Sequence, residues 1–528
     1  MSIHHTLALC CLLLSSCATP YATITPTPAH NKSTLDSVLT ATSTASQALA
    51  RNPKDPAALA AYNTALTSLF STLQDGKIPA WEKPITISSP GGEWTLSGTS
   101  TLAKEGTARK IELIPADRIQ VSGSYTKERN REAGLGAPLI AVVTPAGANV
   151  KKDPFAQGET LYYGITAVAQ FQGRRCQVRF EDPLAVETTQ LAGHRYPLAA
   201  DFTAPLAVML ARENPKKIEL SRLLSPAKFE GTARLARLQP YDPAKIPIIC
   251  VHGLMDSPAT WIPMINYLRA DPQIRARYQF WFFSYPSGYP YPHSAAILRH
   301  QLDAIKKQYP GHKDAIVIGH SMGGCISRLL ITDTGDQIWR EVFGKSPAET
   351  RLSAATKKHF EDTLIFKKRE DVSRVIFISA PLRGSDLATN WPARLASRLV
   401  RTPLTLLNLG QDALKAVIQS PDSLQLQRMP NSIDTMSPKN RFVQAINKIP
   451  PSTQIPYHVI VGDRGKGGNT DHTAPVKSDG FVPYWSSHMP GAQSECIVPS
   501  NHSAHQNPQA MAEVKRILRL PQRKRNLE

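Results

Sequence analysis

The serine at position 321 stands in a setting that suits a nucleophile. Residues 319–323 read GHSMG, directly after a short apolar run at 315–318 and directly before a segment with helical spacing at 324–332. A tight turn between a strand and a helix would lift the serine hydroxyl above the sheet, and the flanking glycines would let strand and helix approach closely. The pattern therefore predicts that Ser321 attacks an acyl carbon, the alternative being a glycine-rich turn without chemistry.

A nucleophilic serine needs a base, and the candidates are histidines near the C-terminus. His502 follows a predicted strand and loop and precedes a helix predicted over 508–518, whereas His458 lies inside an apolar run and is expected in the core. His505, three residues after His502, is the alternative base. We expect His502 to take the proton of Ser321, because it lies in the loop of the last strand–helix unit.

The base in turn needs a carboxylate that fixes its tautomer and stabilises the imidazolium. Two aspartates precede His502 in the required chain order. Asp463 closely follows the apolar run at 457–461, and Asp479 stands in an Asp-Gly turn within residues 478–483 (SDGFVP). Either loop could reach the histidine. The structural alternatives are a surface ion pair for Asp463 and a turn residue for Asp479.

Acyl transfer also needs hydrogen-bond donors aimed at the oxyanion that develops on the carbonyl. Residues 251–255 (VHGLM) stand at the end of a second apolar run, 247–251. In a strand–turn–helix serine site, one donor is the amide after the nucleophile and the other comes from the loop after a neighbouring strand. We expect these donors to be the amides of Met322 and Leu254.

The elements that must position these residues can be predicted from hydrophobic patterning. Short apolar runs rich in β-branched and aromatic residues occur at 247–251, 279–284, 315–318, 374–379 and 457–461. Such runs are typical of strands buried on both faces of a parallel sheet. Helical patterns separate several of them, which predicts an α/β fold with a doubly wound, mostly parallel sheet.

The first half of the chain has a different organisation. A Thr/Pro/Ala-rich tether and a pair of helices are predicted over residues 18–83, and alternating polarity predicts a small β-rich domain over 84–236. The catalytic domain is then expected over 237–528.

Three stretches together resemble the α/β-hydrolase superfamily, and specifically its bacterial lipase and esterase branch. They are residues 252–253 (HG), 319–323 (GHSMG) and 379–385 (SAPLRGS). The resemblance covers the catalytic domain only. Leu382 departs from it, since that branch often has a histidine at the corresponding place.

This resemblance also ranks the two acids. Residues 479–488 contain Asp-Gly-x-Val followed by Ser-Ser-His, which is similar to the stretch that holds the triad acid in bacterial lipases. It therefore favours Asp479, with Asp463 as the alternative. The resemblance further implies a cap over the active site at about 385–445, where leucines and arginines interleave; an ordinary helix packed on the sheet is the alternative.

The N-terminal residues indicate export. Residues 7–14 (LALCCLLL) are apolar but too few to span a bilayer, and small residues follow, as in a signal peptide. The sequence LSSC that ends at Cys17 resembles the bacterial lipobox, which predicts a signal peptide over 1–17 and an acylated Cys17. Because Ala18 follows, the resemblance implies a lipoprotein anchored to the outer membrane of the bacterial cell envelope, facing the periplasm or the surface. An ordinary secretory signal cut after Ala18 or Ala22 is the alternative.

The excess of basic over acidic residues indicates which charged partners the chain could bind. Lys and Arg number 61 and Asp and Glu 42, which gives a formal net charge of +19 at pH 7. A basic surface attracts polyanions and anionic lipid. The positive residues are spread along the chain and no nucleic-acid motif accompanies them, so we expect a membrane and not a nucleic acid as the charged partner.

These features predict a serine hydrolase that cleaves carboxylic esters, with lipid or acyl esters as the leading substrates. The triad needs no cofactor, and the seven cysteines show no zinc-like spacing, so no metal site is expected. Three alternatives remain: an acyltransferase that uses the same triad, an enzyme that cleaves amides or thioesters, and a surface-anchored binding protein with a relic hydrolase fold.

Overall fold

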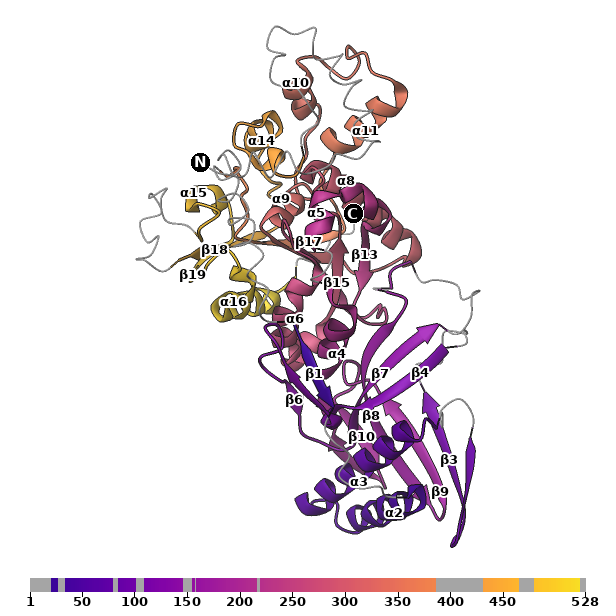
Figure 1. Cartoon of the computed structure of the whole chain (residues 1–528). Helices are drawn as coiled ribbons and strands as arrows, with labels where there is room; N and C mark the ends of the chain where they lie inside the picture. The colour runs from indigo at the N-terminus through magenta and orange to yellow at the C-terminus, as the bar shows by residue number, and fades with distance from the viewer. Residues whose placement is uncertain are drawn as a thin grey trace, which may run out of the picture. The chain divides into compact units, whose positions relative to one another are not determined.

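The computed structural model of the chain describes residues 20–26, 34–78, 84–100, 109–145, 154–156, 158–215, 219–385, 431–464 and 479–522. The chain divides into two compact units (Figure 1). The N-terminal unit comprises Met1–Asn214 with Asn266–Ala276, and the C-terminal unit comprises Pro215–Ile265 with Arg277–Glu528. Within the described residues, none of the helices has both the length and the apolar character that crossing a membrane requires. The expected signal peptide with Cys17 and most of the expected cap lie outside the described residues, and both stay predictions.

The N-terminal unit is built on a six-stranded mixed sheet. Its strands lie in the order β2 (Ile85–Ser89), β3 (Gly92–Ser100), β9 (Arg175–Glu181), β8 (Leu161–Gln172), β7 (Ala137–Pro145) and β4 (Arg109–Pro115). Only β3 and β9 pair in parallel; the other neighbours are antiparallel. Three two-stranded pairs complete the strands: β1 (Thr23–Pro26) with β5 (Ile119–Ser122), β10 (Thr188–Leu191) with β11 (His194–Pro197), and β12 (Ala200–Asp201) with β6 (Arg131–Glu132).

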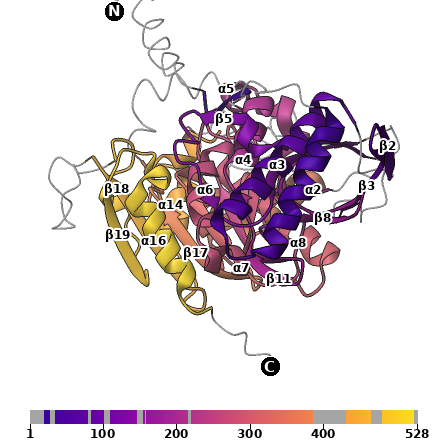
Figure 2. The ribbon, with the colours of Figure 1, turned by 90° about the horizontal axis from the view of Figure 1, so that it is seen from below.

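Two helices pack against this sheet, α2 (Leu35–Arg51) and α3 (Pro56–Asp75), and they lie side by side (Figure 2). The Asp55 side chain caps α3 by accepting from the Ala57 amide, and Pro56 suits the first turn because its missing N–H needs no partner there. The Tyr62 hydroxyl bonds both the carbonyl and the amide of Ala169 in β8, at 2.8 Å each. Helix α3 is therefore joined to the sheet by polar contacts as well as by its apolar face. Before residue 215, the described part of this unit also contains η3 (Ala116–Arg118) and α4 (Ala204–Glu213).

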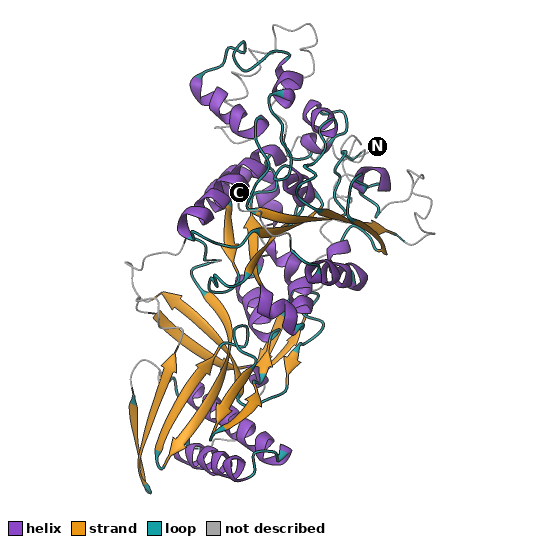
Figure 3. Ribbon diagram, turned by 180° about the vertical axis from the view of Figure 1, so that it is seen from behind, coloured by secondary structure: helices purple, strands orange, loops and turns teal. Residues whose placement is uncertain are grey.

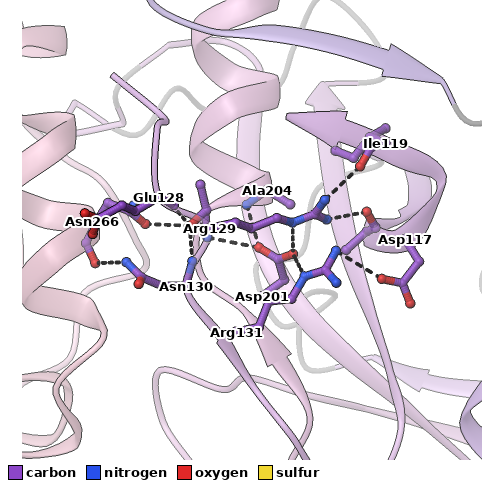
Figure 4. A network of polar contacts seen from close by, with 11 residues as sticks. Asp117, Ile119, Glu128, Arg129, Asn130, Arg131, Asp201, Ala204 and Asn266 are labelled. Atoms are coloured by element: carbon purple, nitrogen blue, oxygen red, sulfur yellow. Dashed lines mark hydrogen bonds and ion pairs between the residues drawn. The ribbon is translucent and has the colours of Figure 1, made fainter. Parts of the chain in front are cut away.

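A buried carboxylate organises the N-terminal unit beside α4 (Figure 4). Asp201 has a side chain that is 2% exposed, and its Oδ2 accepts from Arg129 Nε at 2.7 Å and from Arg131 Nε at 3.1 Å. Its Oδ1 accepts from the amides of Thr203 and Ala204, which begin α4. One carboxylate thus pairs with two guanidinium groups, of which Arg131 also pairs with Asp117, and it satisfies two free helix N–H groups.

Replacing Asp201 by asparagine is expected to destabilise the N-terminal unit by about 3 kcal/mol, because Arg129 loses its pairing with a buried carboxylate and Arg131 loses one of its two ion pairs. Hydrogen exchange of the amides in β6, β12 and α4 would measure this free energy. The matched control is Asp117→Asn. Asp117 pairs with Arg131 at 3.2 Å, but its side chain is 55% exposed, so a loss of at most about 1 kcal/mol is expected. Equal losses in the two variants would contradict the assignment.

The C-terminal unit holds a seven-stranded sheet with helices on both sides (Figure 3). The strand order is β13 (Arg234–Arg237), β15 (Tyr278–Ser284), β14 (Ile246–Val251), β16 (Ala315–His320), β17 (Val372–Ile378), β18 (Tyr457–Asp463) and β19 (Ser494–Pro499). β13 is antiparallel to β15, and all other neighbours are parallel. The predicted α/β class with a doubly wound, mostly parallel sheet is confirmed.

The helices that follow residue 215 lie before, between and after these strands in the chain. They are α5 (Glu219–Leu224), η5 (Pro226–Thr232), η6 (Pro258–Trp261), α6 (Ile262–Arg269), α7 (Pro272–Arg277), α8 (Tyr291–Gln308), α9 (Met322–Arg328), α10 (Gln337–Phe343), α11 (Ala354–Leu364), η9 (Asp434–Met436), α14 (Arg441–Asn447), α15 (Tyr484–Ser487), η10 (Ala504–Gln506) and α16 (Pro508–Arg519). Because β14 to β19 run parallel, their carboxyl ends share one edge of the sheet, and the loops at that edge carry the candidate site residues.

Candidate active site

Ser321 lies on the turn between β16 and α9 with a backbone that L-residues rarely adopt. Its φ is 54° and its ψ is −127°. Its amide donates to the carbonyl of Ile378, the last residue of β17, at 3.0 Å, which holds the turn against the sheet. Such a conformation persists only where the surrounding structure enforces it.

The helix after Ser321 approaches the neighbouring strand so closely that only glycine fits at position 323. A Cβ there would lie 2.2 Å from the carbonyl oxygen of Val251 and 2.5 Å from that of His252. Both atoms belong to the backbone at the end of β14, so neither can move aside cheaply. The second glycine of the GHSMG pattern is therefore required by the packing of α9 on β14.

His502 lies between Ser321 and a carboxylate. Its Nε2 is 2.8 Å from Ser321 Oγ, and its Nδ1 is 2.7 Å from Asp479 Oδ2. Because a carboxylate can only accept, Nδ1–H donates to Asp479 and the Nε2 lone pair faces the serine hydroxyl. This is the tautomer that can remove the proton of a serine.

Asp479 is 1% exposed, and its second oxygen is also fully bonded. Oδ1 accepts from the amides of Phe481 and Val482, both at 2.8 Å. Burial alone would raise the pKa of Asp479, but the hydrogen bond from His502 and the two amides hold that pKa below its usual value. The carboxylate is therefore ionised at neutral pH and able to stabilise an imidazolium at His502.

The alternative acid, Asp463, and the alternative base, His505, lie in the same part of the fold but contact other residues. Asp463 ends β18, and its backbone carbonyl accepts from the Ser500 amide. The His505 ring is buried, with Nε2 2.5 Å from Thr260 Oγ1. His458 is buried within β18, where its Nδ1 contacts Ser494 Oγ at 2.8 Å. The structure thus brings Ser321 together with His502 and Asp479.

The loop after β14 lies directly against the serine. A Cβ on Gly253 would be 2.9 Å from Ser321 Cβ and 3.4 Å from Ser321 Oγ. Leu254 directly follows Gly253, which makes this contact. Met322 directly follows Ser321 and is the first residue of α9. The two donors expected from the sequence therefore belong to the backbone that flanks the hydroxyl.

An aromatic ring braces this loop. The Tyr285 hydroxyl donates to the carbonyl of His252 at 2.7 Å, and the two rings stack with centroids 4.3 Å apart. Burial lowers the pKa of His252 to about 3, so its imidazole is neutral. A neutral, stacked histidine fixes the loop without adding charge beside the site.

A buried thiol stands on the helix that follows Ser321. Cys325 lies one helical turn after Ser321, and its Sγ donates to the Pro381 carbonyl at 3.3 Å. Burial raises the pKa of Cys325 to about 12, so the reactive thiolate is not formed at neutral pH. The four cysteines in the described part of the chain, Cys176, Cys250, Cys325 and Cys496, are all free.

Two apolar side chains beside the site were not singled out from the sequence. Phe481 is 55% exposed, and its ring centroid lies 5.2 Å from that of His502. Met255, next to Leu254, is 44% exposed and has φ 55°. Phe481, two residues after Asp479, belongs to no recognisable sequence pattern, so the sequence alone did not indicate a role for it.

Comparison with known proteins adds the family. Residues 248–514 match the model of the alpha/beta hydrolase family. The chain belongs to this family. Its fold and the match together make it a hydrolase, and the predicted resemblance to the superfamily is confirmed. No curated protein matches the chain.

Solved structures similar to this hydrolase include several bacterial lipases and esterases. The mature lipase BlEst2 of Bacillus licheniformis is 17% identical over 54% of this chain and 97% of its own, with a TM-score of 0.33. EstA of Clostridium botulinum is 13% identical over 57% and 97%, with a TM-score of 0.31. The phospholipase PlaB of Legionella pneumophila is 12% identical over 52% and 60%, with a TM-score of 0.32.

Proposed function

We propose that this hydrolase cleaves carboxylic esters of acyl chains, with Ser321 as nucleophile, His502 as base and Asp479 as the acid that orients the base. One observation carries the proposal. A continuous hydrogen-bonded relay runs from Asp479 through His502 to Ser321 Oγ, with contacts of 2.7 and 2.8 Å, on a serine whose backbone has positive φ.

The reaction follows from this geometry. Ser321 Oγ attacks the ester carbonyl carbon while His502 takes the hydroxyl proton, and the amides of Leu254 and Met322 stabilise the oxyanion. Collapse of the tetrahedral intermediate expels the alcohol, which receives the proton from His502. Water then attacks the acyl-serine with His502 again as base, and the carboxylate leaves.

The test is reaction of the purified chain with a fluorophosphonate probe, followed by hydrolysis of p-nitrophenyl esters from acetate to palmitate. The probe is expected on Ser321 in the tryptic peptide map, and the ester series is expected to give turnover. Absence of labelling and of turnover would sink the proposal and favour a binding protein with a relic fold. Acyl transfer to an added alcohol in preference to water would reassign the enzyme as an acyltransferase.

The exposed Phe481 and Met255 point to the substrate class. Soluble proteins leave few large apolar side chains exposed without a role, and these two lie next to the base and next to an oxyanion donor. An acyl chain extending from the reacting carbonyl would cover them. This placement supports acyl esters over small polar ones.

Phe481→Ala is expected to lower kcat/KM for a p-nitrophenyl ester of ten carbons by about tenfold while changing the acetate ester little, because only the longer chain loses buried apolar area. Paired kinetics on the two esters would measure this. Val186→Ala, which removes another exposed apolar side chain from the N-terminal unit, is the matched control and should change neither ester. An equal loss on both esters would show that Phe481 supports the triad and not the acyl chain.

A further inference from the structure

Three side chains that can bind a metal ion converge behind the catalytic serine and histidine. They are Asp256, His320 and His505, and each offers one ligand atom within 4.8 Å of the others. Asp256 lies in the loop that carries the oxyanion donor Leu254, His320 is the last residue of β16, and His505 lies in η10. None of the three belongs to the hydrogen-bonded relay of the proposed triad.

Both imidazoles present a nitrogen without a partner in the described part of the chain. His320 Nε2 is 2.7 Å from the backbone carbonyl of His502, which can only accept, so Nε2 carries the hydrogen and Nδ1 has a lone pair. That Nδ1 is buried without a hydrogen-bond partner, and so is Nδ1 of His505. The residues are 4% and 1% exposed. For His320, whose tautomer is fixed by the carbonyl of His502, a buried lone pair without a donor is costly unless something positive faces it.

The charges of the cluster suit a cation. Burial lowers the pKa of His320 to about 3 and holds the pKa of His505 well below its usual value, so both rings are neutral and able to coordinate. Desolvation raises the pKa of Asp256 to about 7, assisted by the nearby carboxylate of Glu219. Glu219 accepts from the hydroxyl of Ser257, the residue after Asp256, at 2.8 Å. The cluster thus combines one carboxylate with two neutral imidazoles, and a second carboxylate lies nearby, an arrangement that a divalent cation would stabilise.

We propose that Asp256, His320 and His505 bind one divalent transition-metal ion, with zinc the best match. Two neutral imidazoles with one carboxylate form a donor set that zinc prefers, and a water would complete a tetrahedron. Asp256 is half-buried, and both histidines are buried. Hard ions such as Mg²⁺ and Ca²⁺ prefer oxygen ligands and fit this set less well.

The ion would act as a brace and not as a reactant. It would join the oxyanion loop through Asp256, the nucleophile turn through His320 and the loop of His502 through His505. Occupancy is therefore expected to raise the melting temperature of the chain.

The test is metal binding to the full chain after removal of bound ions with EDTA and dialysis. Cobalt(II) is expected to give the intense visible bands of a tetrahedral site, and zinc titration by calorimetry is expected to show binding that Asp256→Asn and His505→Gln weaken by roughly tenfold or more. His458→Gln is the matched control, because His458 is also a buried histidine with an unpartnered ring nitrogen but lies outside the cluster. His502→Asn removes the imidazole of the proposed base, so zinc binding that survives this substitution does not depend on that imidazole.

Two results would overturn the site. One is no zinc binding to the wild-type chain at micromolar concentration. The other is equal affinity in Asp256→Asn, His505→Gln and His458→Gln. Should the variants fail to fold, X-ray absorption of the wild-type zinc complex decides: two imidazole ligands with distances of about 2.0 Å support the site, and fewer than two refute it. None of these readouts depends on ester hydrolysis.

Discussion

Ser321→Ala is expected to lower kcat for p-nitrophenyl ester hydrolysis by roughly 10⁵-fold, because the acyl-enzyme can no longer form. The residual rate should reflect the two backbone amides and substrate binding alone. The loss should fall on kcat with little change in KM, since the hydroxyl contributes mainly in the transition state. Steady-state kinetics on one ester, with far-UV circular dichroism to verify folding, measure both.

The matched control for this prediction is Ser379→Ala. Ser379 directly follows β17 at the same edge of the sheet, is buried, and also has positive φ (46°). Its Oγ accepts from the Gly462 amide at 3.3 Å, so the variant loses one ordinary hydrogen bond. Its rate is expected to stay within about tenfold of wild type. A Ser321→Ala enzyme as active as this control would mean that another group is the nucleophile.

The central strands could be predicted from sequence because they are buried on both faces. The apolar runs at 247–251 and 315–318 correspond to β14 and β16, whose residues are all buried. The antiparallel edge strand β13 carries an arginine at each end and is only four residues long, so its pattern merged with that of the preceding β-rich segment. A short edge strand has too few buried residues to show a clear hydrophobic period in the sequence.

The division into units shows a second limit of sequence patterns. Residues Asn266–Ala276 belong to the N-terminal unit although they lie between β14 and β15 in the chain. Arg275 in this segment pairs with Glu132 at 2.6 Å, and the Asn266 carbonyl accepts from Asn130 at 2.9 Å. These are contacts between residues far apart in sequence, which periodicity cannot reveal.

Within the candidate site, the serine had the most direct local signal, whereas the histidine was chosen from its place in the last strand–helix unit. Ser321 lies in a strand–turn–helix whose glycines are fixed by packing, so spacing alone selected it. Residue type and chain order left Asp463 and Asp479 open, because no local pattern contains the distance from either loop to His502; only the resemblance of residues 479–488 to bacterial lipases favoured Asp479. The Asp256, His320 and His505 cluster joins a loop, the end of a strand and a short helix that are far apart in the chain, and its members have none of the short spacings that reveal many zinc sites.

Asp479→Asn is expected to lower kcat by about 10⁴-fold. Oδ1 accepts from the amides of Phe481 and Val482, so the asparagine carbonyl would keep that place and its NH₂ would face His502 Nδ1. An N–H cannot accept, so the histidine would place its hydrogen on Nε2 and present no lone pair to Ser321. The shape of the site would change little, and KM should stay near its wild-type value.

Asp463→Asn is the matched control, because it removes the charge of the other candidate acid in the same part of the fold. Asp463 is also buried, and the contact it makes with the last loop uses its backbone carbonyl, which the substitution preserves. Its kcat is expected to stay within about tenfold of wild type. A large loss in Asp463→Asn together with an active Asp479→Asn would transfer the role of the acid to Asp463. The rate of fluorophosphonate labelling should fall in parallel with kcat in Asp479→Asn, since both reactions need the same proton removed from Ser321.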